Sequence, residues 1–342
     1  MVNATLLRRF VPLAALGPSD LAEIARGART GNYQPGQVIF GRGDSAATAV
    51  YLVRGTVELV SERGTTIVRG GSDLARHAIS RSPRRAATAT CIEPCEVVFI
   101  DREKLDLVLT WSQASTVEVV ELGDAEAGAD GDWMTGLLQG QAFQRIPPAH
   151  IAQVFAALRP VEAKPGEEVV REGDPGDSYF IVTHGECEVL RRSGAGAAQS
   201  IARIGVGRGF GEEALLSGEP RNATVRACVP SRLMRLDGAD FARLLRAPLL
   251  TEIAPEDVPA DAVLLDVRLA DEWRGGRLPD SINLPLAKLR ERAAELDAGR
   301  VHVVYCDSGR RSAAAAWLLC ERGIDARLLA GGIPVDEMPV RG

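Results

Sequence analysis

The feature that most constrains the fold is an internal repeat with a fixed offset. The segment 35–40 (PGQVIF) is matched 130 residues later by the segment 165–170 (PGEEVV). The same offset relates Asp44 to Asp174, Gly55 to Gly185 and Glu58 to Glu188. Because a fixed period of self-similarity corresponds to one structural unit, the chain is predicted to contain a duplicated domain.

Each copy of the repeat has the pattern of one helix followed by short strands. Apolar residues recur at helical spacing ahead of both copies, and the runs 57–60 and 187–190 lie between glycine and aspartate turns. Evenly spaced short strands are typical of a barrel or a jelly roll. We therefore predict two β-rolls with flanking helices.

The pattern changes after Leu250. Residues 263–268 and 301–305 form largely apolar runs, as expected for parallel strands covered on both faces, and 312–319 is strongly helix-forming. The predicted fold class is therefore multidomain α+β and α/β, with two β-roll (jelly-roll) domains and then a small α/β domain with a parallel sheet. The predicted boundaries are 1–112 for the first roll, 113–134 for an acidic linker, 135–249 for the second roll and 250–342 for the α/β domain.

Composition narrows the classes of function. The net charge of −6 argues against nucleic-acid binding, which normally leaves a basic surface. No apolar stretch is long enough to cross a membrane and the first ten residues lack a signal-peptide core, so we expect a soluble, cytoplasmic protein. Six cysteines are too few for a disulfide scaffold, and the spacing of Cys91 and Cys95, without a second pair, does not suit zinc. We expect no metal.

The segment 210–224 groups residues suited to a small anionic ligand. Gly211 allows close approach of the backbone, and a helical turn from Glu213 offers free N–H groups. Arg221 carries a permanent charge that can bond two phosphate oxygens, and Glu212 can accept a hydrogen bond from a hydroxyl group. The alternative is that Glu212 and Arg221 form a surface ion pair beside a turn, contributing less than about 1 kcal/mol.

This segment resembles the phosphate-binding cassette of cyclic nucleotide-binding domains, in which Phe-Gly-Glu-x-Ala-Leu is followed by Pro-Arg-x-Ala-Thr. The resemblance implies a cyclic nucleotide ligand, with Glu212 at the ribose 2′-hydroxyl and Arg221 at the cyclic phosphate. The candidate binding residues are Phe210, Gly211, Glu212, Glu213, Ala214, Arg221, Asn222 and Ala223. We expect cAMP in preference to cGMP, although the Asn222 amide, which can donate and accept, discriminates weakly.

The first copy departs from this pattern. Counted from the shared Pro-Arg pair, Arg84 takes the place of Arg221, Ala75 that of Glu212 and Leu74 that of Gly211. Without the carboxylate and the glycine, the first copy is expected to be a structural or dimerising unit. An anion site at Arg84 and Arg85 is the alternative that stays open.

In the C-terminal domain, a predicted strand ends at Cys306 just ahead of a helix. Loop N–H groups, the helix N-terminus and the neighbouring Arg310 and Arg311 would favour a thiolate there and would bind an anionic substrate. Cysteine phosphatases share this plan but have five residues between cysteine and arginine, whereas four separate Cys306 from Arg311. An inert, buried cysteine is a further alternative.

The loop 306–312 (CDSGRRS) resembles the active-site loop of rhodanese-type sulfurtransferases, Cys-x-x-Gly-x-Arg-Ser, and the segments 265–268, 278–285 and 329–333 follow in the family's order. The resemblance implies that Cys306 takes a sulfane sulfur from an anionic donor such as thiosulfate, carries it as a persulfide and passes it to an acceptor that the sequence does not identify. The candidate catalytic residues are Cys306, Arg311, Arg310, Ser308, Gly309, Asp307 and Ser312.

Within this resemblance, Arg310 and Arg311 would hold the donor while the loop amides surround the sulfur. Asp307 would oppose thiolate formation unless an arginine pairs with it. The chain departs from the family at Arg277, where histidine is common, and in 333–338, which lacks the usual tryptophan. A non-catalytic module that recognises a partner or an anion is the alternative to an enzyme.

The helical stretch 238–247 is expected to stop at Pro248, which leaves no long helix to close over a bound nucleotide. We hypothesise that the α/β domain or the first β-roll supplies this lid, which would couple nucleotide binding to sulfur transfer by about 1 to 3 kcal/mol. No nucleic-acid or membrane partner is expected, and a homodimer is one option for the oligomeric state.

Overall fold

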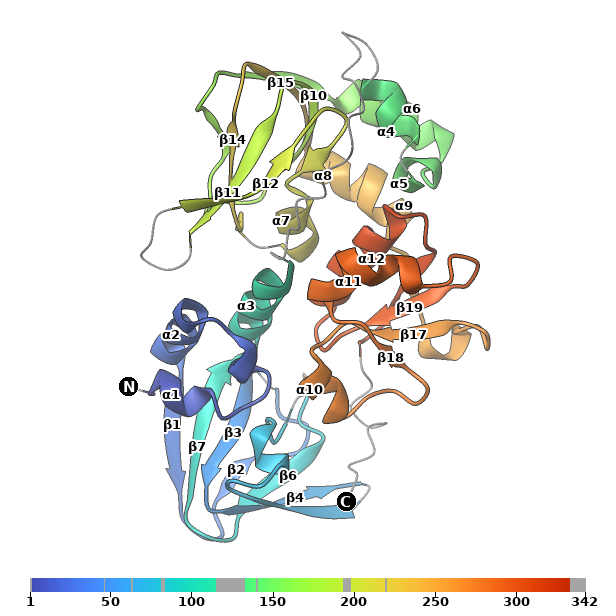
Figure 1. Ribbon diagram of the computed structural model, residues 1–342. Coiled ribbons are helices and arrows are strands. Elements are labelled where there is room, and N and C mark those ends of the chain that lie inside the picture. The colour runs from blue at the N-terminus through green and yellow to red at the C-terminus, as the bar shows by residue number, and fades with distance from the viewer. Residues whose placement is uncertain are drawn as a thin grey trace.

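A computed structural model describes residues 2–45, 47–62, 64–80, 84–114, 133–139, 141–192, 198–218 and 220–332. These residues form two rolls of antiparallel strands and a C-terminal domain with a parallel sheet, which confirms the predicted fold class (Figure 1). Most of the predicted acidic linker, and all of the segment 333–338, lie outside the described residues.

The first β-roll packs two antiparallel sheets against each other and covers one of them with helices. Its helices are α1 (Ala4–Leu7), α2 (Pro18–Gly27) and α3 (Arg102–Ala114), and its strands are β1 (Arg29–Tyr33), β2 (Val38–Phe40), β3 (Thr48–Arg54), β4 (Thr56–Ser61), β5 (Gly64–Arg69), β6 (Ala87–Cys91) and β7 (Cys95–Asp101). The strand orders are β1-β7-β3 and β2-β6-β4-β5. Strand β3 is buried on both faces, because Val50 and Leu52 point between the sheets whereas Ala49 and Tyr51 pack against the helices.

The second β-roll repeats this plan. Its helices are α4 (Trp133–Gln139), α5 (Gln141–Gln144), α6 (Pro148–Ala157), α7 (Glu212–Ser217), α8 (Gly238–Phe241) and α9 (Ala247–Leu249), and its strands are β8 (Arg159–Ala163), β9 (Glu168–Val170), β10 (Ser178–His184), β11 (Cys187–Arg192), β12 (Ala198–Ile204), β13 (Gly209–Phe210), β14 (Thr224–Ala227) and β15 (Ser231–Asp237). Strand β15 pairs with β8 and β10, as β7 pairs with β1 and β3. The predicted duplication is therefore present in the strand pairing.

The duplication extends to backbone conformation. Gly55 and Gly185, which are equivalent in the repeat, have φ angles of 90° and 85°. A Cβ atom would lie 2.3 Å from the Pro94 carbonyl oxygen at the first position and 2.4 Å from the Ser231 hydroxyl at the second. Because a left-handed conformation and a close contact coincide, both copies require glycine at this turn.

The helical stretch after β15 is short, as predicted. It runs from α8 through a π-helical segment, Ala242–Arg246, into α9 and ends at Leu249, one residue past the predicted stop at Pro248. Proline is tolerated there because it lies in the first turn of α9. The stretch buries Phe241, Leu244 and Leu245 in the core, so it does not close over a ligand.

The C-terminal domain has a five-stranded parallel sheet with the order β16-β20-β19-β17-β18. Its strands are β16 (Glu252–Ile253), β17 (Val263–Asp266), β18 (Ile282–Asn283), β19 (His302–Tyr305) and β20 (Ala326–Leu329), and its helices are α10 (Ala270–Arg274), α11 (Leu286–Arg292) and α12 (Arg310–Cys320). Val304 packs in the same core as α11 and α12, whereas Val303 and Tyr305 are buried in a separate apolar cluster. Both faces of β19 are thus covered, as its apolar run predicts.

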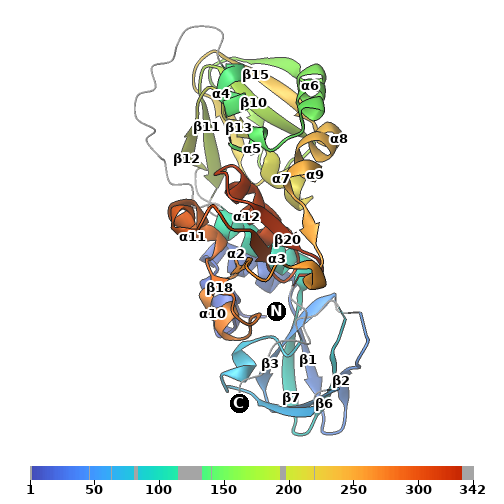
Figure 2. The same cartoon turned by 90° about the vertical axis from the view of Figure 1, so that its right-hand side faces the viewer.

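The C-terminal domain lies between the two β-rolls (Figures 1 and 2). Helix α12 contacts α7 of the second roll and α3 of the first. One continuous apolar core joins the second roll to the C-terminal domain, and in it the rings of Phe241 and Trp317 lie 5.3 Å apart. The two predicted sites are therefore linked by packed elements.

Candidate functional sites

A cavity of about 190 Å³ lies in the second β-roll at the start of α7, and we refer to it as the α7 cavity. Apolar side chains of the roll, including Val170, Val189 and Ile201, form one part of its wall. The structure brings all eight candidate binding residues to this cavity, namely Phe210, Gly211, Glu212, Glu213, Ala214, Arg221, Asn222 and Ala223. A mixed apolar and charged lining suits a ligand with an apolar ring and an anionic group.

Gly211 brings the backbone close to Arg221. Its φ angle is 95°, and a Cβ atom there would lie 2.6 Å from Arg221 Nη1 and 2.9 Å from the Ser178 carbonyl oxygen. Gly211 is also the residue that precedes the first turn of α7. The glycine thus lets β13 turn into α7 directly beside the guanidinium.

Arg221 is buried, with only 4% of its surface exposed. Its Nη1 donates to the Gly211 carbonyl at 2.9 Å, and its Nη2 donates to the Ser178 carbonyl at 2.7 Å and to Asp177 Oδ1 at 3.3 Å. Burial lowers the pKa of Arg221, and Asp177 partly opposes that effect. Two backbone carbonyls therefore orient a buried cation at the wall of the α7 cavity.

Glu212 presents a carboxyl group to the same cavity. Its Oε2 atom is buried and has no hydrogen-bond partner in the described part of the chain. Burial first, and then the neighbouring charge of Glu213, raise the pKa of Glu212 to about 8. A buried acceptor without a partner is costly in a folded protein, so this atom is poised for a donor that a ligand would bring.

Glu213 turns toward a residue of another domain. The Asn222 amide donates to Glu213 Oε2, and Arg290 Nη2 of α11 lies 3.9 Å from Glu213 Oε1. Arg290 also lines the α7 cavity. Nothing in the sequence pattern indicates that an arginine of the C-terminal domain reaches this site.

The first β-roll keeps an arginine at the equivalent place, but it is Arg85 and not Arg84. Arg85 Nη2 donates to the Thr48 carbonyl at 2.7 Å, as Arg221 does to Ser178, 130 residues further on. The backbone of Arg85 also pairs with Gly43 and Asp44, as that of Arg221 pairs with Gly173 and Asp174. The alignment on the Pro-Arg pair was therefore wrong by one residue.

The predicted matching of Leu74 and Ala75 to Gly211 and Glu212 is also wrong. Ser80 pairs with Val50 as Phe210 pairs with Phe180, 130 residues further on, so the segment that corresponds to the cassette follows Ser80. Leu74 and Ala75 lie ahead of it, in a single 3-10 turn, Leu74–Arg76, and Ala75 is buried. The Arg85 guanidinium stacks over the Phe40 ring at 4.4 Å.

Cys306 follows β19 and is fully buried. Two backbone amides of the loop donate to its sulfur, Gly309 N at 3.1 Å and Ser312 N at 3.4 Å, and the Ser312 hydroxyl lies 3.5 Å away. Of the loop amides expected to surround the sulfur, those of Gly309 and Ser312 therefore donate to it. However, burial raises the pKa of the Cys306 thiol, and Arg311 only partly counters it. The expectation of a thiolate favoured by the loop is wrong for this arrangement, because burial outweighs the nearby positive charge.

Arg311 is directed into the protein. Its Nη1 and Nη2 donate to Glu272 at 2.8 and 3.1 Å, Nη2 lies 3.4 Å from Asp307, and Nε lies 3.6 Å from Asp106. Only 1% of the residue is exposed. The expected role in holding an anionic donor does not fit this arrangement, because three carboxylates already surround the guanidinium.

Asp307 lies between two arginines. Its carboxylate is 3.0 Å from Arg268 Nη1 and 3.4 Å from Arg311 Nη2. Arg268 is itself fully buried and paired with Asp266 at 2.7 Å. The ion pair expected for Asp307 is therefore present. Because two arginines pair with its carboxylate, Asp307 is not an unpaired negative charge beside the sulfur.

Helix α3 of the first roll covers the Cys306 loop. The Ser308 hydroxyl donates to Asp106 Oδ2, and Arg310 Nη1 donates to the Glu103 carbonyl at 3.2 Å. Beside this contact lies a cavity of about 930 Å³, which we refer to as the α3 cavity. Its wall includes His77, Arg102 and Asp106 of the first roll and the loop residues Asp307, Ser308, Gly309, Arg310, Arg311 and Ser312. Both loop arginines therefore reach helix α3, Arg310 at the Glu103 carbonyl and Arg311 at Asp106.

Arg277, at the position where the rhodanese family commonly has histidine, stacks over the Trp273 ring at 4.1 Å. This stacking gives the cation a structural partner outside the Cys306 loop.

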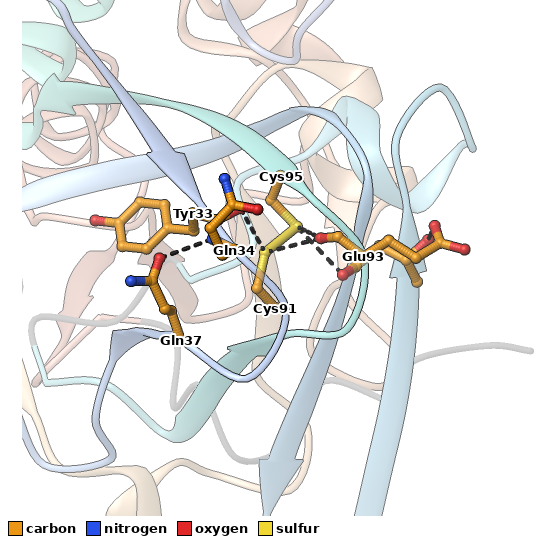
Figure 3. The surroundings of a disulfide bond; sticks show 7 residues. Tyr33, Gln34, Gln37, Cys91, Glu93 and Cys95 are labelled. Atoms are coloured by element: carbon orange, nitrogen blue, oxygen red, sulfur yellow. Dashed lines mark hydrogen bonds between the residues drawn. A yellow bond between two sulfur atoms is a disulfide. The ribbon is translucent and has the colours of Figure 1, made fainter.

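The first roll also contains a disulfide between Cys91 and Cys95, which the sequence analysis did not predict (Figure 3). The two sulfurs lie 3.0 and 2.9 Å from the Glu93 carbonyl oxygen, and the neighbouring turn is closed by a hydrogen bond from Gln34 N to Gln37 Oε1 at 2.7 Å (Figure 3). Among the described residues, no group of three or more His, Cys, Asp or Glu side chains could hold a metal ion. No helix of the described chain is long and apolar enough to span a bilayer.

Comparison with known families divides the chain into the same three parts. The model of the cyclic nucleotide-binding domain matches residues 30–110 and 160–247, and that of the rhodanese-like domain matches residues 251–335. A cyclic nucleotide-gated potassium channel of Mesorhizobium japonicum is 38% identical over 112 residues, which are 32% of this chain and 30% of the channel. The chain thus matches less than a third of the length of this relative.

The solved structures that match include the regulatory domain of Toxoplasma gondii PKA with cAMP. It is 19% identical, the match covers 72% of this chain and 91% of that chain, and the TM-score is 0.32. The sensor domain of the transcriptional regulator DNR from Pseudomonas aeruginosa has 22% identity, 34% coverage of this chain, 77% of that chain and a TM-score of 0.31.

Proposed function

Because the chain contains two cyclic nucleotide-binding domains followed by a rhodanese-like domain, we propose that it is a cyclic nucleotide-responsive protein that transfers sulfur through Cys306. The observation that carries the nucleotide part is the α7 cavity, where a buried arginine and a carboxyl oxygen without a partner meet. The rhodanese part rests on the amides that point at the Cys306 sulfur.

In the α7 cavity, Arg221 would bond the cyclic phosphate and Glu212 the ribose 2′-hydroxyl. The two carbonyls that hold Arg221 fix its orientation before the ligand arrives, which reduces the entropy lost on binding. The ribose hydroxyl would supply the donor that Glu212 Oε2 lacks. Both cAMP and cGMP carry these groups, and we propose cAMP as the preferred ligand.

In the rhodanese-like domain, the Cys306 thiolate would attack the outer sulfur of a donor such as thiosulfate. The sulfur–sulfur bond of thiosulfate breaks, sulfite leaves with the electron pair, and the outer sulfur stays on Cys306 as a persulfide. A nucleophilic acceptor then takes that sulfur and releases the Cys306 thiolate. The amides of Gly309 and Ser312 would stabilise the negative charge on the sulfur in both steps.

A second candidate function is a non-catalytic signalling protein whose rhodanese-like domain recognises a partner or an anion. The observation that favours it is the burial of both Cys306 and Arg311, together with the raised pKa of the Cys306 thiol. In this case the domain would keep the family's fold and the loop without turning over a sulfur donor.

Mass spectrometry of the intact protein after incubation with thiosulfate separates the two functions. Transfer predicts a mass gain of one sulfur atom in the wild type, none in Cys306→Ser and an unchanged gain in the control Cys228→Ser, whose thiol is in the second roll. Absence of the gain in the wild type would exclude the enzymatic function and leave the second candidate.

Titration with fluorescent cAMP and cGMP tests the nucleotide part. Arg221→Ala is expected to lose at least about tenfold in affinity, since it removes a charge-assisted pair with the phosphate. Arg226→Ala is the matched control, because Arg226 is on the next strand and pairs with Glu188 outside the α7 cavity. Equal losses in the two variants would contradict the assignment of Arg221.

A further inference from the structure

We propose that the nucleotide site is completed by a second domain, with Arg290 of α11 as an additional cation for the bound ligand. The proposal rests on the nucleotide-binding function proposed above. Among the described residues that line the α7 cavity, Arg290 is the one contributed by the rhodanese-like domain. The site is therefore assembled from two domains of one chain.

The position of Arg290 is determined by packing and not by a chance surface contact. Leu286 and Leu289, on the same helix, are buried in the core that α11 shares with α12 and the second roll. Helix α12 in turn contacts α7, whose first residues line the α7 cavity. A side chain on α11 is thus held in the wall of the cavity by the same core that joins the domains.

A second tie fixes the domains to each other. Arg145, in the turn that follows α5, donates through Nη1 to the Ile324 carbonyl at 2.8 Å and through Nη2 to Asp325 at 2.9 Å. This contact lies beyond the end of α12. Rotation of the rhodanese-like domain away from the second roll would have to break it as well as the apolar core.

Arg290 is only loosely paired with Glu213, and Glu321 and Arg322 are the further charged side chains that interact with it. Its distance of 3.9 Å from Glu213 Oε1 is at the upper limit for an ion pair, and its side chain is 30% exposed. Glu213 has the Asn222 amide as a second partner, so it keeps a hydrogen bond if Arg290 moves toward the ligand. The cavity presents two carboxyl groups, Glu212 and Glu213, and its other cations are Arg221 and Arg191. Arg290 adds a cation on the side of Glu213, where it offsets the repulsion between that carboxyl group and an anionic phosphate.

Arg290 would therefore contact the ligand from a part of the cavity wall that the stretch 238–249 does not reach. That stretch is packed into the shared core, and none of its residues lines the α7 cavity. A contact between Arg290 and the ligand would join the rhodanese-like domain to the second roll. The affinity for the ligand would therefore depend on the position of the domain that carries Cys306.

Helix α12 connects the nucleotide site to the Cys306 loop directly. Helix α12 has 11 residues, begins after the Cys306 loop, and contacts α7 as well as α11. At 1.5 Å per residue, α12 spans about 16 Å between the sulfur loop and its other end. A ligand that draws α11 toward α7 acts on the helix that also bears Ser312, one of the donors to the sulfur.

The test is a calorimetric titration of the full-length protein with cAMP and cGMP. Arg290→Ala is expected to weaken binding by about tenfold and to reduce the dependence of the affinity on salt, since one cation at the ligand is lost. The matched control is Arg292→Ala, on the same helix, whose side chain is 45% exposed and pairs with Glu295. Arg290→Lys should recover part of the affinity, because the charge remains.

The outcomes distinguish this inference from the function on which it rests. If the wild type binds neither nucleotide, the proposed nucleotide function fails and the inference fails with it. If the wild type binds, Arg221→Ala does not, and Arg290→Ala matches the wild type in affinity and salt dependence, the inference is overturned while the function stands. A loss in Arg290→Ala that Arg292→Ala shares would also overturn it.

Discussion

Replacing Glu212 by glutamine is expected to change how the stability of the protein depends on pH. The pKa of Glu212 is about 8 in the folded protein against an ordinary value of 4.5, with burial as the main cause. A carboxyl group whose pKa is raised on folding contributes stability that is complete below about pH 4.5 and is lost as the pH rises through about 8. Glutamine keeps the shape of the side chain and has no proton to lose.

The size of this effect on stability follows from the difference between the two pKa values, 4.5 and about 8. Each pH unit between the two pKa values changes the free energy of unfolding by about 1.4 kcal/mol, so the wild type is expected to lose on the order of 3 kcal/mol between about pH 4.5 and pH 7 through this group. The variant should therefore be more stable than the wild type at neutral pH. Above about pH 8, where Glu212 is ionised, the variant should also bind cyclic nucleotide less tightly than the wild type, since an amide accepts a ribose hydroxyl more weakly than a carboxylate.

Urea unfolding of the full-length proteins between about pH 5 and pH 8, followed by tryptophan fluorescence, measures the difference. Trp317 is a suitable reporter because it packs in the core that the second roll shares with the rhodanese-like domain. Glu188→Gln is a control with the opposite expected effect. Because Arg226 lowers the pKa of Glu188, removing this carboxylate should lower the free energy of unfolding at neutral pH. Parallel pH profiles for the wild type and Glu212→Gln would refute the reasoning.

Three other substitutions test separate features. Asp106→Asn is expected to lower the pKa of the Cys306 thiol, because the charge of Asp106 raises this pKa. Alkylation of Cys306 by iodoacetamide should then be roughly 2- to 10-fold faster near neutral pH. An unchanged pH profile of alkylation would contradict this expectation. Gly211→Ala should destabilise the second roll by about 1 to 3 kcal/mol in thermal unfolding, because its Cβ would lie 2.6 Å from Arg221 Nη1 at a φ angle of 95°. Phe241→Ala removes a fully buried ring and should reduce the free energy of unfolding, measured in urea, by about 3 to 5 kcal/mol. A loss below about 1 kcal/mol would show that neighbouring side chains fill the space the ring leaves.

The parts of the site that could be predicted from the sequence are those that lie close together along the chain. Gly211, Glu212 and Arg221 are separated by a short helix and a turn, so their spacing alone indicates that they share a cavity. The duplicated fold was equally accessible, because glycine turns and strand runs recur at a constant offset. Local spacing carries this kind of information well.

The parts that could not be predicted depend on contacts between domains or on burial. Asp106 and Arg290 belong to domains other than the ones whose sites they reach, and domain packing leaves no periodic signal in either segment. The equivalence of Arg85 with Arg221 was missed because two adjacent arginines, Arg84 and Arg85, follow Pro83, and matching the Pro-Arg pair selected the first of them. The direction of the Cys306 pKa was missed because a sequence shows which charges are near but not how deeply the sulfur lies.

The junction near residue 250 is a poor place to divide this polypeptide. Phe241, Leu249 and Leu250 on one side, and Leu286 and Trp317 on the other, belong to a single apolar layer. A fragment that ends or begins at this junction would carry half of that layer into water and is expected to aggregate. The smallest unit suited to independent expression, crystallisation or transfer into another gene is therefore the second β-roll together with the rhodanese-like domain, because the interface between them is a shared core.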